Sequence, residues 1–225
     1  MLVVFDVDGT LTRTVGLDAA LFAQAVHDVH GIVMTDDDWR ACPQVSDQGL
    51  AEYTLARRGN TARAAARAVK RRFLELLATG LGAPSPALRV AGAAEVFAGL
   101  ARAGHRVAIA TGCWEAAARL KLSRALVAHA RVPFASSDDH PAREAILRMA
   151  IARGGAGAGT ERVVYVGDGP WDVAATRRLG LPLVGVDHEG SGRLASLGVS
   201  HVVRDLADLD ALVAALAAAV VPGAA

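Results

Sequence analysis

The chain has 225 residues, 52% of them hydrophobic, and a formal net charge of +1. This length and apolar content fit one large domain, or a core domain with a smaller insert, and exclude a disordered chain. The near-neutral charge argues against a nucleic-acid-binding protein, and no apolar stretch reaches the roughly 20 residues of a membrane span. With Cys42 and Cys113 far apart and no basic leader, the sequence predicts a cytoplasmic protein with free thiols.

The first ten residues combine a short apolar run with two carboxylates. Residues 2–5 predict a buried strand, and Asp6 and Asp8 follow it directly, ahead of a Gly-Thr pair. Open α/β sheets bind their ligands at the carboxyl ends of parallel strands, so both aspartates are candidates for one small site. On this stretch alone, a strand that ends in a solvated aspartate turn is the alternative.

Residues 15–83 carry only helical patterns. Apolar spacing predicts helices over 18–30, from 36, over 48–57 and over 62–79, with no strand among them. A Gly/Pro-rich linker at 82–86 closes the segment. We therefore expect an all-helical cap domain at residues 15–83, inserted after the first strand.

Strands and helices alternate through the rest of the chain. The pattern predicts strands at 107–110, 132–135, 162–166, 183–186 and 202–203. It predicts helices at 94–103, 114–130, 141–152, 172–179, 191–197 and 206–219, with a flexible Gly/Ala loop at 154–159. This alternation is typical of an α/β fold with a doubly wound parallel sheet, here formed by residues 1–14 and 84–225.

Polar residues follow three of these predicted strands. Asp6 and Asp8 follow the first, Thr111 the next along the chain, and Asp168 and Asp172 a later one. Carboxylates that converge at one sheet edge require a counter-charge, and a site built from oxygen ligands suits Mg²⁺. For each pair taken singly, a helix cap or an aspartate turn is the alternative. Three strand ends together favour a metal site.

These motifs resemble the haloacid dehalogenase (HAD) superfamily of hydrolases, in its phosphoglycolate-phosphatase-like form with a helical cap. The resemblance rests on Asp6-Val7-Asp8-Gly9-Thr10, on Thr111 after a strand, and on Gly167-Asp168-Gly169-Pro170-Trp171-Asp172. It implies an α/β Rossmann-like core and hydrolysis of a phosphoric monoester.

The resemblance also implies a role for each motif residue. Asp6 would be the nucleophile and form an aspartyl-phosphate, and Asp8 would protonate the leaving oxygen and then take a proton from water. Thr111 and the N–H of Gly112 would hold phosphoryl oxygens. Mg²⁺ would be bound by Asp6, by the main-chain carbonyl of Asp8 and by Asp168, with Asp172 as a ligand or as a neighbour of the ligands.

The family also has a basic residue, commonly Lys, before its fourth motif. Arg143, at a helix start after Pro141, is the favoured candidate, because its planar charge suits a phosphoryl oxygen and a carboxylate. Lys121 is the competitor, but it lies inside a predicted helix, where we expect a solvated face. A surface ion pair with Glu144 or Asp139 is the alternative for Arg143.

The cap and Asp8 bear on the substrate. A helical cap predicts a small phosphorylated metabolite, and Ser46 and Asp47, between cap helices, are either substrate contacts or a helix N-cap pair. Asp8 favours phosphate-ester hydrolysis over dehalogenation, because an ester oxygen leaves poorly without a proton. The alternatives are a phosphomutase, a phosphonatase that would need the cap's Lys70, or a noncatalytic phosphate-binding protein. We expect Cys113 to serve packing, and the oligomeric state to be monomer or homodimer.

Overall fold

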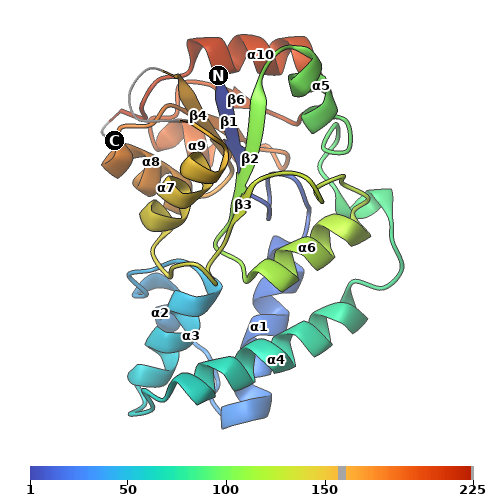
Figure 1. Ribbon diagram of the computed structural model, residues 1–225. Helices are drawn as coiled ribbons and strands as arrows, with labels where there is room; N and C mark the ends of the chain where they lie inside the picture. Colours follow the sequence, from blue (N-terminus) through green and yellow to red (C-terminus); the bar gives the residue numbers. More distant parts are fainter. Residues whose placement is uncertain (157–160, 224–225) are drawn as a thin grey trace.

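The fold is built around one parallel sheet (Figure 1). The computed structural model describes residues 1–156 and 161–223, so the predicted loop at 154–159 lies partly outside the described residues. Within them, the six strands have the order β3-β2-β1-β4-β5-β6, and every pairing is parallel. The strands are β1 (Leu2–Phe5), β2 (Arg106–Ala110), β3 (Phe134–Ala135), β4 (Val163–Gly167), β5 (Leu183–Val186) and β6 (Val202–Val203).

The strand order brings the three predicted motifs together. β1 lies between β2 and β4, and Phe5 is in register with Ile109 of β2 and Val166 of β4. The three strands therefore end side by side, at the same edge of the sheet. This arrangement confirms the α/β fold with a doubly wound parallel sheet.

Helices cover both faces of the sheet. In β1, Val3 and Phe5 face one hydrophobic cluster, and Leu2 and Val4 face another. The first cluster is covered by α5 (Val96–Arg102), α6 (Glu115–Arg124) and α10 (Leu209–Ala218). The second is covered by α7 (Arg143–Arg153), α8 (Pro170–Leu179) and α9 (Arg193–Ser196). Burial on both faces explains why the strands read as continuous apolar runs.

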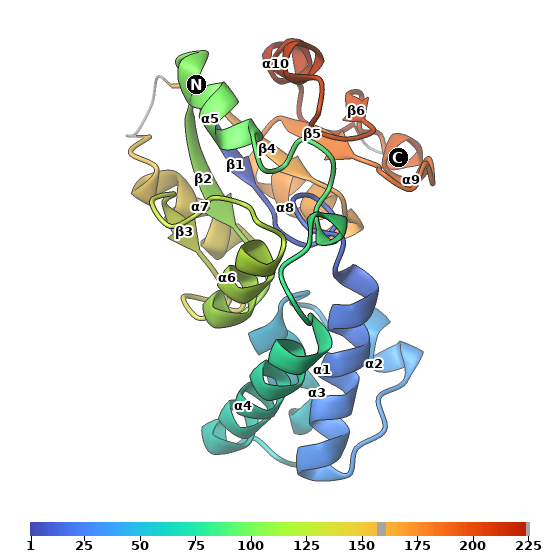
Figure 2. The same cartoon turned by 90° about the vertical axis from the view of Figure 1, so that its right-hand side faces the viewer.

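The inserted segment forms a helical layer of its own (Figure 2). It contains α1 (Val15–His30), α2 (Asp36–Arg40), α3 (Asp47–Ala56) and α4 (Arg63–Gly80), and residues 15–83, all described, contain no strand. Phe22 of α1 stacks on Trp114, which precedes α6, with ring centroids 5.8 Å apart. The cap thus shares a hydrophobic cluster with the core. Its division from the core at residues 14/15 and 83/84 stays a prediction.

One predicted helix is too long. We expected a helix over 114–130, but α6 ends at Arg124. Leu126 takes a left-handed conformation, with φ of 58°, and the N–H of Val127 donates to the carbonyl of Leu122 at 2.9 Å. This turn sends the Val127 side chain into the core cluster. The Ala/Val-rich run carries helical propensity, but burial of Val127 overrides it.

Two smaller features complete the fold. A short 3₁₀-helix (Pro86–Leu88) follows the predicted linker. Within residues 1–156 and 161–223, no helix is both long and apolar enough to cross a bilayer.

Candidate active site

The turn after β1 brings two carboxylates to the sheet edge. Asp6 ends the strand, and the chain then reverses through Gly9, whose φ is 77° and whose N–H donates to the carbonyl of Thr12 at 2.7 Å. A Cβ at position 9 would lie 2.0 Å from Oδ2 of Asp168. Only glycine therefore permits both this backbone conformation and the close approach of the β4 loop to the turn that carries Asp6 and Asp8.

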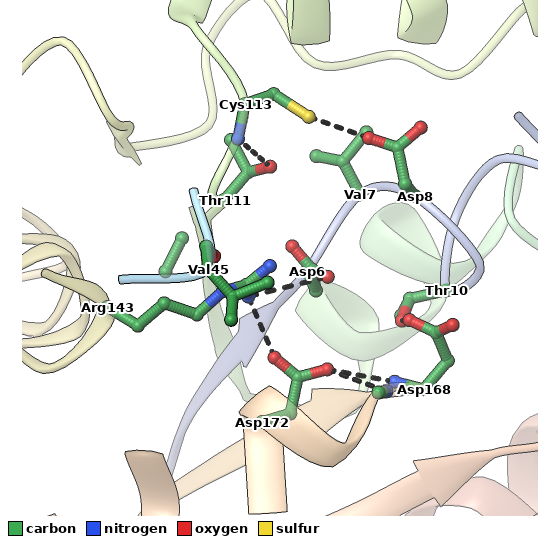
Figure 3. Close-up of polar contacts among 12 residues, drawn as sticks. Asp6, Val7, Asp8, Thr10, Val45, Thr111, Cys113, Arg143, Asp168 and Asp172 are labelled. Atoms are coloured by element: carbon green, nitrogen blue, oxygen red, sulfur yellow. Dashed lines mark hydrogen bonds and ion pairs between the residues drawn. The ribbon is translucent and has the colours of Figure 1, made fainter. Parts of the chain in front are cut away.

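Arg143 lies between two of the carboxylates (Figure 3). Its Nη1 donates to Oδ1 of Asp172 at 2.8 Å and is 3.7 Å from Oδ2 of Asp6. Its Nε donates to the carbonyl of Val45, in the cap, at 2.9 Å. Burial lowers the pKa of Arg143, but the carboxylates of Asp6 and Asp172 outweigh this effect and raise it. The guanidinium is therefore a fixed positive charge within the site.

This geometry assigns different partners to the two basic candidates. Arg143 reaches the proposed nucleophile, and its side chain is only 12% exposed, so it is not a surface ion pair. Glu144 pairs instead with Arg178. Lys121 reaches Asp8, and the expectation that it lies on a solvated helix face is wrong, because its side chain is fully buried.

Asp172 holds the site together through both of its oxygens. Oδ1 accepts from Arg143 and from the hydroxyl of Tyr165 at 3.1 Å. Oδ2 accepts from the backbone N–H groups of Asp168 and Gly169, at 3.1 and 2.9 Å. These four hydrogen bonds favour the second of the two roles left open for Asp172, in which it orients its neighbours and is not itself a metal ligand.

The acidic cluster fits a divalent cation. One carboxylate oxygen from each of Asp6, Asp168 and Asp172 lies within 4.8 Å of the others. Oδ1 of Asp6 is buried and has no hydrogen-bond partner. Burial raises the pKa of Asp6 to about 7 and, with the neighbouring carboxylates, that of Asp168 to about 9. The crowded oxygens of Asp6 and Asp168, with the Asp172 carboxylate beside them, are of the kind that Mg²⁺ prefers as ligands.

Asp8 belongs to a second polar cluster, beside the first. Its Oδ2 accepts from Nζ of Lys121 at 2.8 Å and from Sγ of Cys113 at 2.7 Å, and its Oδ1 accepts from the hydroxyl of Thr14. Lys121 also pairs with Asp18 of α1, in the cap. Burial raises the pKa of Asp8, but Lys121 and these hydrogen bonds outweigh it, so the net pKa is lowered. Cys113 is buried as expected, but it also orients Asp8.

Thr111 and Gly112 follow β2 and border the same site. Thr111 is buried, and its hydroxyl accepts from the backbone N–H of Cys113 at 3.1 Å. A Cβ at position 112 would lie 2.8 Å from Nη2 of Arg143 and 3.1 Å from the carbonyl of Val45. Glycine at this position lets Arg143 pass between the core and the cap.

Ser46 and Asp47 fasten the cap to the core. The hydroxyl of Ser46 caps α3 by accepting a backbone N–H at 3.1 Å, and it donates to the carbonyl of Pro141 at 2.6 Å. The N–H of Asp47 donates to the carbonyl of Gly112 at 2.8 Å, and its Oδ2 accepts from the N–H of Trp114 at 2.8 Å. Ser46 is thus a helix N-cap, and both residues also border the cavity described next.

A cavity of about 190 Å³ lies where the cap meets the core. The core contributes its polar end, with Asp6, Asp8, Thr111, Gly112 and Arg143. The cap contributes mostly apolar side chains from α1, α2, α3 and the loop between α2 and α3. The arrangement can hold a phosphoryl group against Asp6 and enclose the rest of a small ligand beneath the cap.

Comparisons with known proteins agree with the fold and the motifs. The chain matches the family "haloacid dehalogenase-like hydrolase" over residues 1–180 and belongs to it. It is a hydrolase whose sheet and helical cap are shared with solved structures of that family. No curated protein sequence matches the chain.

Three solved structures illustrate the likeness. A hydrolase from Pseudomonas syringae has 21% identity and a TM-score of 0.72, with 92% of this chain and 94% of that chain covered. CbbY from Rhodobacter sphaeroides, in complex with phosphate, has 23% identity and a TM-score of 0.65, with 92% and 95% covered. β-Phosphoglucomutase from Clostridium difficile has 14% identity and a TM-score of 0.70, with 96% and 97% covered. Identities this low support a shared fold alone.

Proposed function

We propose that the protein is a Mg²⁺-dependent phosphatase that hydrolyses a small phosphate monoester through an aspartyl-phosphate on Asp6. The observation that carries this proposal is the position of Arg143, 3.7 Å from Asp6 at the polar end of the cavity between cap and core. A fixed cation beside a buried carboxylate can draw a phosphoryl group to that carboxylate and neutralise charge during transfer.

The proposed steps use the residues of both clusters. Asp6 attacks phosphorus, while Thr111 and the N–H of Gly112 hold phosphoryl oxygens. Asp8 gives a proton to the leaving oxygen and later accepts one from the attacking water. Lys121 favours the ionised form of Asp8, so the contacts support the proton-accepting half of this role most directly. Asp172 keeps Arg143 in place.

The same cluster would hold the metal. Asp6 and Asp168 would contribute carboxylate oxygens, with the main-chain carbonyl of Asp8 as implied by the family. Bound there, Mg²⁺ would supply positive charge to the phosphoryl oxygens and allow both carboxylates to stay ionised.

Two related activities have less support. A phosphonatase would use Lys70 of the cap, but Lys70 pairs with Asp138 and lies over the ring of Trp114, away from the residues that border the cavity. A phosphomutase would hold a second phosphate, and among the described residues that border the cavity Arg143 is the only Lys or Arg. A noncatalytic phosphate-binding protein would bind phosphate without turnover.

Turnover of p-nitrophenyl phosphate tests the proposal. We expect hydrolysis with Mg²⁺, loss of hydrolysis with EDTA, and at least about a 1000-fold lower kcat for Asp6→Asn, because the nucleophile is removed. Asp210→Asn, an exposed carboxylate on α10, is the control and should match the wild type. Near-native activity of purified Asp6→Asn would sink the proposal, and phosphate binding without metal-dependent turnover would favour the noncatalytic protein.

A further inference from the structure

The cavity has one polar end and one apolar end. Besides Cys113 near the polar end, seven hydrophobic side chains border it: Val15, Ala19, Trp39, Cys42, Val45, Leu50 and Trp171. Six of them belong to the cap, and Trp171 belongs to the core. A phosphoryl group held by Asp6 and Arg143 would therefore direct the rest of the substrate toward an apolar wall.

The volume of the cavity limits the size of the part of the substrate beyond the phosphoryl group. The cavity of about 190 Å³ is smaller than the roughly 300–1,000 Å³ of pockets for drug-sized ligands. A phosphoryl group and a chain of a few carbon atoms fill such a space.

The charged residues around the cavity limit the chemical groups that the rest of the substrate can carry. Arg143 is the only Lys or Arg among the described residues that border the cavity, and it already contacts Asp6, Asp172 and the carbonyl of Val45. Lys121 is paired with Asp8 and Asp18 and does not border the cavity. A second anionic group on the substrate would lie against the apolar wall with no cation to pair with, which disfavours its binding.

The titratable groups that face this end are themselves acidic. Asp18 of α1 and Asp47 of α3 both border the cavity from the cap. Burial raises the pKa of Asp18 to about 6 and that of Asp47 well above its usual range. Neither carboxyl group supplies positive charge to a second anion, whereas a hydroxyl or an amide could hydrogen-bond to either of them.

We propose that the substrate's leaving group is a short, uncharged alcohol that carries no second phosphate and no carboxylate. This inference rests on the proposed function, because the orientation of the substrate follows from the phosphoryl site at Asp6. It narrows the substrate class within small phosphate monoesters, and it excludes sugar bisphosphates and phosphorylated hydroxy acids.

A groove outside the cavity offers the competing possibility. It has a volume of about 340 Å³, shares Val15 with the cavity, and is bordered by Asp168 and by the exposed side chains of Arg13 and Arg193. A longer substrate whose second anionic group reached these arginines would not be excluded by the charges of the cavity. Both ligands of the test below are too short to reach these arginines, so that test measures the cavity alone. Hydrolysis of a sugar bisphosphate with a higher kcat/KM than a neutral monoester would overturn the proposal directly.

The test compares two phosphonates of matched shape, phosphonoacetamide and phosphonoacetate. Calorimetric titration into the wild-type protein with Mg²⁺ measures binding of each, and neither result depends on turnover. We expect the neutral amide to bind at least about 100-fold more tightly than the carboxylate, because only the carboxylate is buried uncompensated. Equal binding, tighter binding of phosphonoacetate, or no binding of the amide would overturn the inference.

A cation added to the cavity wall gives a second test with the same two ligands. Val45→Arg adds a cation at the cavity wall, and we expect it to lower the preference for the amide by about tenfold. Val33→Arg adds the same charge at a cap position that is 72% exposed and does not border the cavity, and it should leave the preference unchanged. An unchanged preference in Val45→Arg would count against the inference. If the preference holds while p-nitrophenyl phosphate is not hydrolysed, the proposed function fails and the binding inference stands.

Discussion

Arg143 makes more contacts at the site than a lysine could reproduce. Its Nε reaches the carbonyl of Val45, and its Nη1 reaches Asp172 and Asp6. A lysine ammonium is a single point of charge and cannot span these positions at once. The residue therefore joins the cap loop, the proposed nucleophile and the first turn of α8.

Two substitutions of Arg143 should distinguish the effect of its positive charge on kcat from the effect of its planar guanidinium. Arg143→Ala is expected to lower kcat for p-nitrophenyl phosphate by about 100- to 1000-fold, as for other preorganised donors to a reacting group. Arg143→Lys should recover part of this loss, because it restores the charge without the planar fork. Arg178→Ala, on α8 with a side chain 66% exposed, is the control and should change kcat little. Wild-type kcat in Arg143→Ala would contradict the role.

The positions of the residues at the strand ends could be predicted from the sequence, but the burial of Lys121 inside α6 was predicted wrongly. The spacing of apolar runs located Asp6, Asp8, Thr111, Asp168 and Asp172, because parallel strands end at a common edge. Lys121 was misplaced, although Ala117, Ala118 and Leu122 lie on the same buried face of α6. Its apolar neighbours at helical spacing were the signal. Its partners Asp8 and Asp18 are distant in sequence, and no local sequence pattern predicts an ion pair between such distant residues.

The elements could be predicted more fully than their ends. All six strands were expected, since a fully buried sheet leaves apolar runs that turns interrupt. The end of α6 was missed, because burial of Val127 decides it, and burial depends on contacts across the fold. The hydrogen bonds from Ser46 to Pro141 and from Asp47 to Gly112 also lie outside what the sequence predicts, because they join parts of the chain that are distant in sequence.

Helices α2 and α3 are joined by a bidentate ion pair. Arg58, just beyond α3, donates from Nη1 and Nη2 to the two oxygens of Asp38 in α2, at 3.0 and 2.9 Å. The Asp38 side chain is 2% exposed. The hydrogen bonds from Arg58 lower the pKa of Asp38 below its usual value. A pair of this kind fixes the loop that follows α2, which carries Val45 and Ser46 to the site.

This pair predicts a pH dependence of stability. Because the native pKa of Asp38 is below the unfolded value of about 4, its contribution is present above about pH 4 and is lost as the pH falls through the native pKa. We expect the difference in the free energy of unfolding in urea between the wild type and Asp38→Asn to shrink from about pH 6 to about pH 3. Carboxyl groups with a raised pKa, such as Asp6 and Asp18, act in the opposite sense but do so in both proteins. A difference that stays constant over this pH range would contradict the assignment.

The ion pair of Asp38 and Arg58 should also stabilise the folded protein at neutral pH. Arg58→Met should lower the free energy of unfolding by about 1.5–3 kcal/mol, as for hydrogen bonds to charged groups. Arg40→Met removes an exposed pair with Asp36 on α2 and should cost less than about 1 kcal/mol.

Cap and core meet through packing and through charge. Trp114 and Ala117 of the core belong to the cap's hydrophobic cluster, and Phe22 stacks on Trp114. The Lys121 ammonium pairs with Asp18 in the cap and with Asp8 in the core. The position of the cap is therefore linked to the side chain proposed to move the proton, so that closure of the cavity and orientation of Asp8 depend on one buried lysine.

A double-mutant cycle measures this link between cap and core. The free energy of unfolding in urea would be compared for Lys121→Met, Asp18→Asn and the double variant. We expect a coupling energy of about 1–3 kcal/mol, because each single change leaves a buried group without its partner. The control cycle uses Arg72 and Asp28, which pair at 2.8 Å within the cap with side chains 38% and 28% exposed, and should give a clearly smaller coupling because solvent screens the pair. A coupling at Lys121 and Asp18 no larger than this control would mean that packing alone holds the cap on the core. A larger coupling energy would mean that the Lys121 ammonium beside Asp8 also fixes the position of α1 over the cavity.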